Sequence, residues 1–140
     1  MNEQSEKCVM VIDETLPLGI IANTAAILGI TLGKERSDLV GMDVTDQSGR
    51  CHPGIIEFPV PVLKGSVSVI RQLRERLWEP DFEELTVVDF SDLAQSCKTY
   101  GEFIEKMARV PEAELQYLGL VICGAKKKVN RLTGSMGLLR

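Results

Sequence analysis

Acidic residues close two apolar runs of the sequence and are the first candidates for chemistry. Asp13 ends the run KCVMVID with Glu14 next to it, and Asp89 stands near the end of the run ELTVVDF. A carboxylate can orient water or transfer a proton, and ligands of open sheets sit beyond the carboxyl ends of the strands. We therefore expect Asp89 to be catalytic and Asp13 to bind a ligand. The alternatives are that Asp89 caps the short helix after it and that Asp13 only faces water.

A dense polar set follows in the stretch SDLAQSCKTYGEF. One helical turn would bring Ser91 and Gln95 onto one face, with Lys98 shortly after them. Asn23 is a further polar residue, set in an otherwise apolar stretch. We expect these four residues to help form a pocket over the strand ends, because sites often lie on loops carried by a rigid sheet. The alternative is a solvated connection.

Three lysines open the last expected helix, in the stretch GAKKKVNRLTGS. Lys126, Lys127 and Lys128 fall in its first turn, where free backbone N–H groups already make the potential positive. Together they oppose the helix dipole by roughly 1–2 kcal/mol. A bound anion would reverse that sign, whereas acidic neighbours would merely neutralise the lysines. We expect an anionic or small-molecule ligand near Lys126 and the acidic strand ends.

The four cysteines are scattered along the chain, at Cys8, Cys51, Cys97 and Cys123. They form no C-x-x-C pair of the kind used by zinc sites and redox motifs. Cys51 beside His52, the only histidine, could be half of a metal site, although Gly49 and Pro53 indicate a loop. Cys8 and Cys123 fall in expected strands, where reduced cysteine behaves as a small apolar residue. We expect no metal and no cofactor.

Composition limits the class of protein. The chain has 140 residues, 44% hydrophobic and 26% charged, which predicts one ordered domain. Its net charge of −4 makes RNA an improbable partner except through a local patch. The longest apolar stretch, LGIIANTAAILGITLG, is too short and interrupted to span a bilayer. We expect a cytoplasmic protein without membrane contact, with residues 1–6 disordered.

Four strands and several helices alternate along the sequence. The expected strands are residues 7–13, 58–64, 84–90 and 115–124, with the last one central and the second at an edge because of its two prolines. The expected helices are residues 18–33, 67–78, 100–110 (closed by Pro111) and 125–132, with a short helix near residues 91–98. Residues 33–58 read as a long connection with one short edge strand near LVGMDV.

A capping box starts the helix that follows residue 99, with Thr99 and Glu102 expected to satisfy each other's backbone donors. One face of this helix is expected to carry Tyr100, Phe103, Ile104 and Met107.

Two further helices show informative patterns. The helix over residues 67–78 can be capped by Ser66 and has apolar residues at helical spacing. We expect its solvent face to consist of Arg71, Gln72, Arg74, Glu75 and Arg76. The helix over residues 18–33 is apolar on nearly all sides, which indicates either deep burial or cover by a second subunit. We therefore expect a homodimer.

The alternation of strands and helices predicts an α/β protein. Helical crossovers usually connect parallel strands, so the expected sheet is open, covered on both faces and mostly parallel. In such a sheet the carboxyl ends of the strands would gather the candidate site residues at one edge.

Several stretches, taken in order, resemble type II peptidyl-tRNA hydrolases. They are VMVIDETLPLGIIANTAAI, PVPVLKGS, LTVVDFSD and LGLVICGAKKKVNRLTGSMGLL. The chain is still more similar to a family known only as a domain of unknown function, which shares the hydrolase-like fold. The resemblance implies a four-stranded mixed sheet with helices on both faces, and often a homodimer.

The hydrolase signature is incomplete at the matched positions. The functionally important lysine of those enzymes falls at Ala22, and Ile20 stands at the other lysine position. Asp89 matches the aspartate at the end of the third strand, but Ser91 and Leu93 replace a glycine and a threonine. A helical insert over residues 91–113 replaces a short hairpin, and Ser135 replaces a histidine after the matching Thr133 and Gly134.

Three hypotheses follow for the function. The first is an enzyme related in fold to the hydrolases but altered in chemistry, which binds a small anionic ligand at the strand ends. The second is a noncatalytic interaction module, and the third is a peptidyl-tRNA or related ester hydrolase. An enzyme should hold Asp89 in a concave pocket with a second polar group within hydrogen-bond reach, whereas a module should present a flat apolar or lysine-rich surface.

Overall fold

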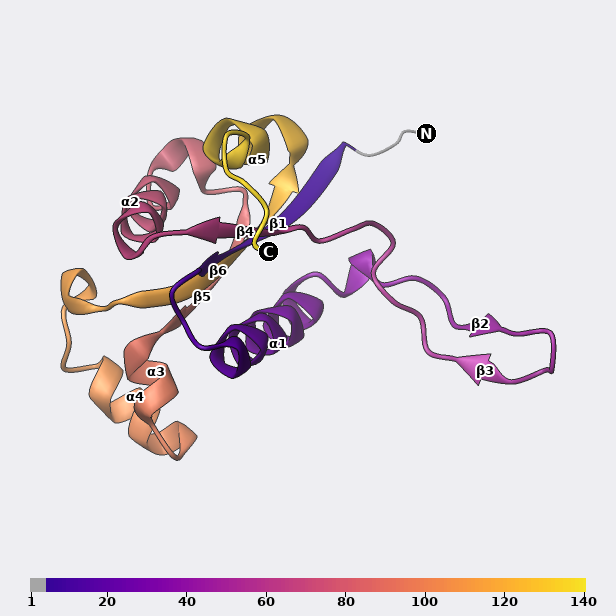
Figure 1. Ribbon diagram of the computed structural model, residues 1–140, viewed down its shortest axis with the longest axis horizontal. Helices are drawn as coiled ribbons and strands as arrows, with labels where there is room; N and C mark the ends of the chain where they lie inside the picture. The colour runs from indigo at the N-terminus through magenta and orange to yellow at the C-terminus, as the bar shows by residue number, and fades with distance from the viewer. Residues whose placement is uncertain (1–4) are drawn as a thin grey trace.

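The computed structural model describes residues 5–140 and shows an α/β protein with helices on both faces of one sheet (Figure 1). The strands of the main sheet are β1 (Glu6–Asp13), β4 (Val62–Gly65), β5 (Thr86–Ser91) and β6 (Tyr117–Ala125). The helices are α1 (Leu18–Glu35), α2 (Val67–Leu77), α3 (Asp92–Ser96), α4 (Tyr100–Met107) and α5 (Lys126–Thr133). Of the six residues expected to be disordered, residues 1–4 lie outside the described residues, whereas Glu6 already belongs to β1.

The strand order is β4-β1-β6-β5, and only β1 and β4 pair in parallel. The expectation of a mostly parallel sheet is therefore wrong, although the sheet is mixed and β6 is central as expected. The connection through α3 and α4 brings the chain back into the sheet at the end where β5 finishes. Strand β6 starts there and therefore runs antiparallel to both of its neighbours, β1 and β5. The carboxyl end of β6 consequently lies at the opposite end of the strands from the carboxyl ends of β1 and β5.

The central strands separate two apolar cores. Alternate residues of β1 point to opposite faces, so Val9 and Val11 pack toward α2 and α5, while Met10 and Ile12 pack toward α1. This two-sided burial explains why the β1 sequence is apolar throughout. The register pairs Val11 with Leu120 across the centre of the sheet.

The edge strand β4 is shorter than expected, because it begins only after Pro59 and Pro61. The C-terminal tail covers its free side. The Lys64 amide donates to the Gly137 carbonyl and the Leu139 amide donates to the Val62 carbonyl, both at 2.9 Å. The tail therefore prevents this edge from pairing with another chain.

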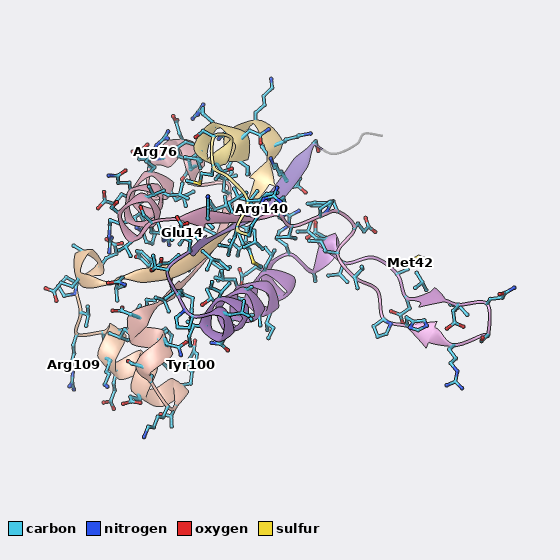
Figure 2. The ribbon with its side chains drawn as sticks, viewed as in Figure 1. Glu14, Met42, Arg76, Tyr100, Arg109 and Arg140 are labelled. Carbon is cyan, nitrogen blue, oxygen red and sulfur yellow. A yellow bond between two sulfur atoms is a disulfide. The ribbon has the colours of Figure 1, made fainter. Side chains whose placement is uncertain are left out.

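Local capping chemistry is confirmed at two helices. Ser66 Oγ accepts from the Val69 amide at the start of α2 (3.2 Å), and Thr99 Oγ1 accepts from the Glu102 amide at the start of α4 (3.1 Å). In the second cap, the Glu102 carboxylate was expected to accept from the Thr99 amide. It accepts instead from the amide of Lys98, one residue earlier (2.8 Å). Tyr100, on the expected apolar face of α4, is exposed (Figure 2).

Residues 40–56 form a projection that we call the arm (Figure 1). It contains the two-residue strands β2 (Val44–Thr45) and β3 (Cys51–His52), which pair as an antiparallel ribbon. A bridge between Val40 and Ile56 closes its base. The sequence indicated only one short strand here. Within residues 5–140, no helix combines the length and hydropathy needed to cross a membrane.

Candidate functional sites

Asp13 is buried at the carboxyl end of β1 and serves the following turn. Its Oδ1 accepts from the Thr15 amide (2.9 Å) and from the Thr15 hydroxyl (2.7 Å). The carboxylate is 1% exposed, so the alternative that it simply faces water is wrong. Glu14, beside it, is exposed. The geometry of Asp13 is that of an aspartate stabilising a turn.

The structure brings Asn23 and Gln95 together, as the pocket hypothesis required. Asn23 Nδ2 donates to Gln95 Oε1 across 3.3 Å, linking α1 to α3. Both side chains are exposed, as is Lys98. Ser91 is buried, and its hydroxyl accepts from the Ala94 amide as the cap of α3 (3.2 Å). The polar residues expected at the carboxyl ends of β1 and β5 therefore form the cap of α3, through Ser91, and an exposed contact between Asn23 and Gln95.

Asp89 lies on the opposite face of the sheet, under α2. It sits within β5, paired with Leu120, and its Oδ2 accepts from Arg74 Nε at 3.0 Å. The Arg74 guanidinium stacks on Trp78, 3.7 Å from the ring centre. Asp89 does not cap α3, because Ser91 does, so that alternative is wrong. The ion pair neutralises the carboxylate that the sequence marked as catalytic.

Arg71 joins a second polar cluster next to this pair. Its Nη1 donates to Glu112 (2.7 Å), and the Tyr117 hydroxyl donates to the same carboxylate (2.5 Å). The Tyr117 hydrogen bond lowers the pKa of Glu112, while burial followed by that carboxylate raises the pKa of Tyr117. Tyr117 is therefore held as a neutral donor, which makes it a poor general base.

A cleft of about 580 Å³ opens beside this cluster. It is lined by the start of α2 and by the segment that leads into β6, including Ser66, Arg71, Gln116 and Tyr117. Asp89 does not line it. The expectation that Arg71 and Arg74 face solvent is wrong: Arg74 is 6% exposed and Arg71 is half-buried. A signal existed in the sequence, because Arg74 stands four residues after Ile70 and three before Leu77, on the buried stripe of α2.

The three lysines follow the carboxyl end of β6, at the opposite end of the strands from Asp13. They therefore do not share a pocket with Asp13, Asn23 or Asp89. The common site expected from the sequence is therefore wrong, because β6 runs antiparallel to β1. Lys128 donates to the Asp81 carbonyl (2.6 Å) and lies 3.8 Å from Glu84, as the neutralisation alternative required. Lys126 and Lys127 are exposed.

Lys126 lines a shallow hollow together with Lys7. This hollow has a volume of about 210 Å³, and its other lining residues are Glu6, Phe58, Pro59 and Pro61. Lys7 Nζ donates to Asn130 Oδ1 at 2.7 Å, which holds its charge beside the middle of α5. The small hollow is therefore lined by two lysines, one of them the first residue of α5, and by the Glu6 side chain.

Cys8 and Cys123 form a disulfide between β1 and β6. They are direct partners in the register, and both are fully buried. The expectation of reduced cysteines at these positions is therefore wrong. Cys51 is a free, exposed thiol on the arm, and Cys97 is free and half-buried. In the described part of the chain, no three potential metal-ligating side chains gather.

The outer face of α1 is apolar and exposed. It consists of Leu18, Ala22, Ala26 and Ile30, four residues apart, of which Leu18 is 82% and Ile30 75% exposed. The inner face buries Thr24, Leu28 and Leu32 instead. No charged residue occurs between Leu18 and Gly33. An uncharged helix face of this kind is typical of a contact surface.

The arm adds a second exposed apolar surface. Met42 is 86%, Val44 60% and Ile55 79% exposed, and Figure 2 shows Met42 far from the sheet. Sequence reasoning recognised the helix face through its lack of charge but missed the arm. The alternation of Met42 and Val44 was the available signal, and the surrounding glycines and charges obscured it.

The chain belongs to the family described as protein of unknown function (DUF2000), whose model matches residues 6–140. Its structure is similar to that of Atu0240, a protein of unknown function from Agrobacterium tumefaciens strain C58, with a TM-score of 0.87. The two share 15% sequence identity over 97% of this chain and 98% of that one. This likeness shows a common fold. No curated protein matches the chain significantly.

Proposed function

We propose that this protein is an interaction module whose contact surface comprises the outer face of α1 and the arm. The observation that carries the proposal is the exposure of Ile30 and Met42, large apolar side chains on two elements joined by one turn. Each square ångström of apolar surface removed from water contributes about 25 cal/mol, so covering these side chains favours association. The two acidic candidates for a site support this assignment, because the Asp89 carboxylate is paired with Arg74 and the Asp13 carboxylate accepts from Thr15.

A photo-cross-linking residue in place of Ile30 or Met42 should form covalent adducts in the cells that naturally make the protein. The same residue in place of Glu75, which is exposed on α2, should form none, because α2 lies on the other face of the sheet. Denaturing electrophoresis of the irradiated cells reads out the result. Equal adduct yields at all three positions, or none at any, would contradict the proposal.

A second candidate function is anion binding in the hollow of Lys7 and Lys126. The observation that favours it is the convergence of two lysines on one hollow at the start of α5. The positive end of the α5 dipole adds to the potential of the lysines, although the Lys126 amide itself donates to the Ser5 carbonyl (2.9 Å). Such a site retains the anionic ligand expected from the sequence, but places it at the carboxyl end of β6 only.

Phosphate should therefore raise the melting temperature more than chloride at matched ionic strength. At ten times the dissociation constant the gain is about 1.4 kcal/mol, roughly 4–6 °C for a domain of this size. The double change Lys7→Gln and Lys126→Gln should remove the increment, whereas Lys98→Gln, at the carboxyl ends of β1 and β5, should leave it intact. An increment lost in Lys98→Gln instead would move the anion to the carboxyl ends of β1 and β5.

We infer in addition that the fold is of the type II peptidyl-tRNA hydrolase kind. The stretches that resemble those enzymes form the unit of β1 and α1, strands β4 and β5, and the unit of β6 and α5. Hydrolase activity is the least favoured function, because Ala22 occupies the position of the functionally important lysine. Ala22 carries no charge and belongs to the outer face of α1.

A further inference from the structure

An apolar pocket of about 140 Å³ lies between the end of α1 and the base of the arm. Its lining includes Met10 of β1, Gly29 and Gly33 of α1, and Val40 and Ile56 at the base of the arm. Met10 belongs to the buried core on this face of the sheet, whereas Val40 is 44% exposed. The apolar pocket therefore reaches from the surface to the side chains of the core.

Two glycines of α1 keep this pocket open. A Cβ at Gly33 would have no atom within 4 Å, and a Cβ at Gly29 would lie 3.8 Å from Met10 Cε, which is ordinary van der Waals contact. Both residues lie within α1, where the backbone is helical and would accept alanine. Because glycine stabilises a helix less than alanine does, the helix itself does not explain its presence at both positions. Its effect is to leave room beside Met10.

Among the described residues that line the apolar pocket, only Arg36 is charged, and its donors are already used. Its Nε and Nη2 donate to Asp38 (2.9 and 2.8 Å), and its Nη1 and Nη2 donate to Glu6 (3.2 and 2.8 Å). An anionic ligand would have to compete with these two carboxylates for the same donors. What the guanidinium can still offer is its aliphatic stem and the face of its plane, which stacks well on aromatic rings.

We propose that the apolar pocket binds one small, uncharged aromatic molecule, of about the size of benzene. A protein cavity of about 150 Å³ lined by apolar side chains stays dry and takes up benzene, so the volume and the lining both fit such a ring. The sulfur of Met10 adds to the preference, because thioether sulfur makes favourable contacts with aromatic rings. The site does not depend on the proposed interaction function, since Ile30 and Met42 do not line it.

Benzene is the probe, and the melting temperature in sealed cells is the first measurement. A ligand this small is expected to have a dissociation constant of about 1 mM. Benzene at about ten times that concentration should raise the melting temperature of the native chain by roughly 4–6 °C. Gly33→Leu should abolish the increment by filling the pocket, whereas Gly19→Leu, at an exposed position of α1 outside the lining, should retain it. Sodium benzoate should add nothing beyond sodium chloride, because its charge would lose its hydration.

The methionine methyl groups report where benzene binds. In protein labelled with carbon-13 at these methyl groups, a bound ring should shift the nuclear magnetic resonance signal of Met10, which lines the pocket. The signals of Met107 and Met136 should stay in place, because both residues pack against the core on the other face of the sheet. The variant Met10→Leu assigns the signal of Met10.

The proposal is overturned if benzene leaves the Met10 signal unmoved, or if it moves the methionine signals of both cores alike. Native benzene binding by a folded Gly33→Leu variant, or equal binding of benzoate and benzene, would overturn it as well. Should Gly33→Leu fail to fold, the Met10 signal of the native chain decides the question. These measurements do not involve the cross-links at Ile30 and Met42, so the binding site and the interaction function can fail separately.

Discussion

Reduction of the Cys8–Cys123 disulfide is expected to lower the free energy of unfolding by about 3–4 kcal/mol. The bond joins β1 and β6 across a sequence separation of 115 residues, so it removes a large loop entropy from the unfolded chain. Equilibrium urea unfolding of the oxidised and reduced native protein measures the difference. Comparing two redox states of one sequence avoids the cavity that a cysteine-to-alanine change would leave.

The thiols that remain free provide the control for this prediction. Replacing Cys51 and Cys97 by serine should change the stability of the oxidised protein little, because neither is in a disulfide. Alkylation after unfolding without reductant should label two cysteines per chain. Four labelled cysteines would contradict the disulfide. Because disulfides are rare in the cytosol, this measurement also bears on the cytoplasmic location, which stays a prediction.

Arg74→Met should destabilise the protein by about 2–3 kcal/mol, since it leaves the Asp89 carboxylate without its buried partner. This value is below the usual cost of breaking a buried pair because the Asp89 side chain is 28% exposed and water can partly solvate it. The change Asp89→Asn should cost a similar amount by leaving the Arg74 charge unpaired. Urea midpoints of the native chain and the variants measure both effects.

The double variant with Arg74→Met and Asp89→Asn tests whether the two residues act as a pair. Its loss of stability should be smaller than the sum of the single losses by about 1–2 kcal/mol, because neither charge is then left alone. Arg76→Met on the same helix is the matched control, as Arg76 is exposed and should cost about 0.5 kcal/mol or less. Additive losses would show that Asp89 does not depend on Arg74.

Local sequence determined the elements and several of their ends. The continuous apolar run before Asp13 predicted a strand buried on both faces, and Ser66 and Thr99 predicted the starts of α2 and α4. These features depend on the spacing of apolar side chains along the sequence and on hydrogen bonds between residues a few positions apart. The central position of β6 followed from its apolar composition in the same way. Such properties need no knowledge of the rest of the chain.

The tertiary structure decided which of these elements face one another. The direction of β6 depends on the return of the chain through α3 and α4, and no local pattern encodes it. That direction separates Lys126 from Asp13, and the packing of α2 places Arg74 against Asp89. Types and spacing of residues thus determined which groups could do chemistry. Their neighbours were decided by contacts between residues distant in the chain, which are satisfied only when the whole sheet is assembled.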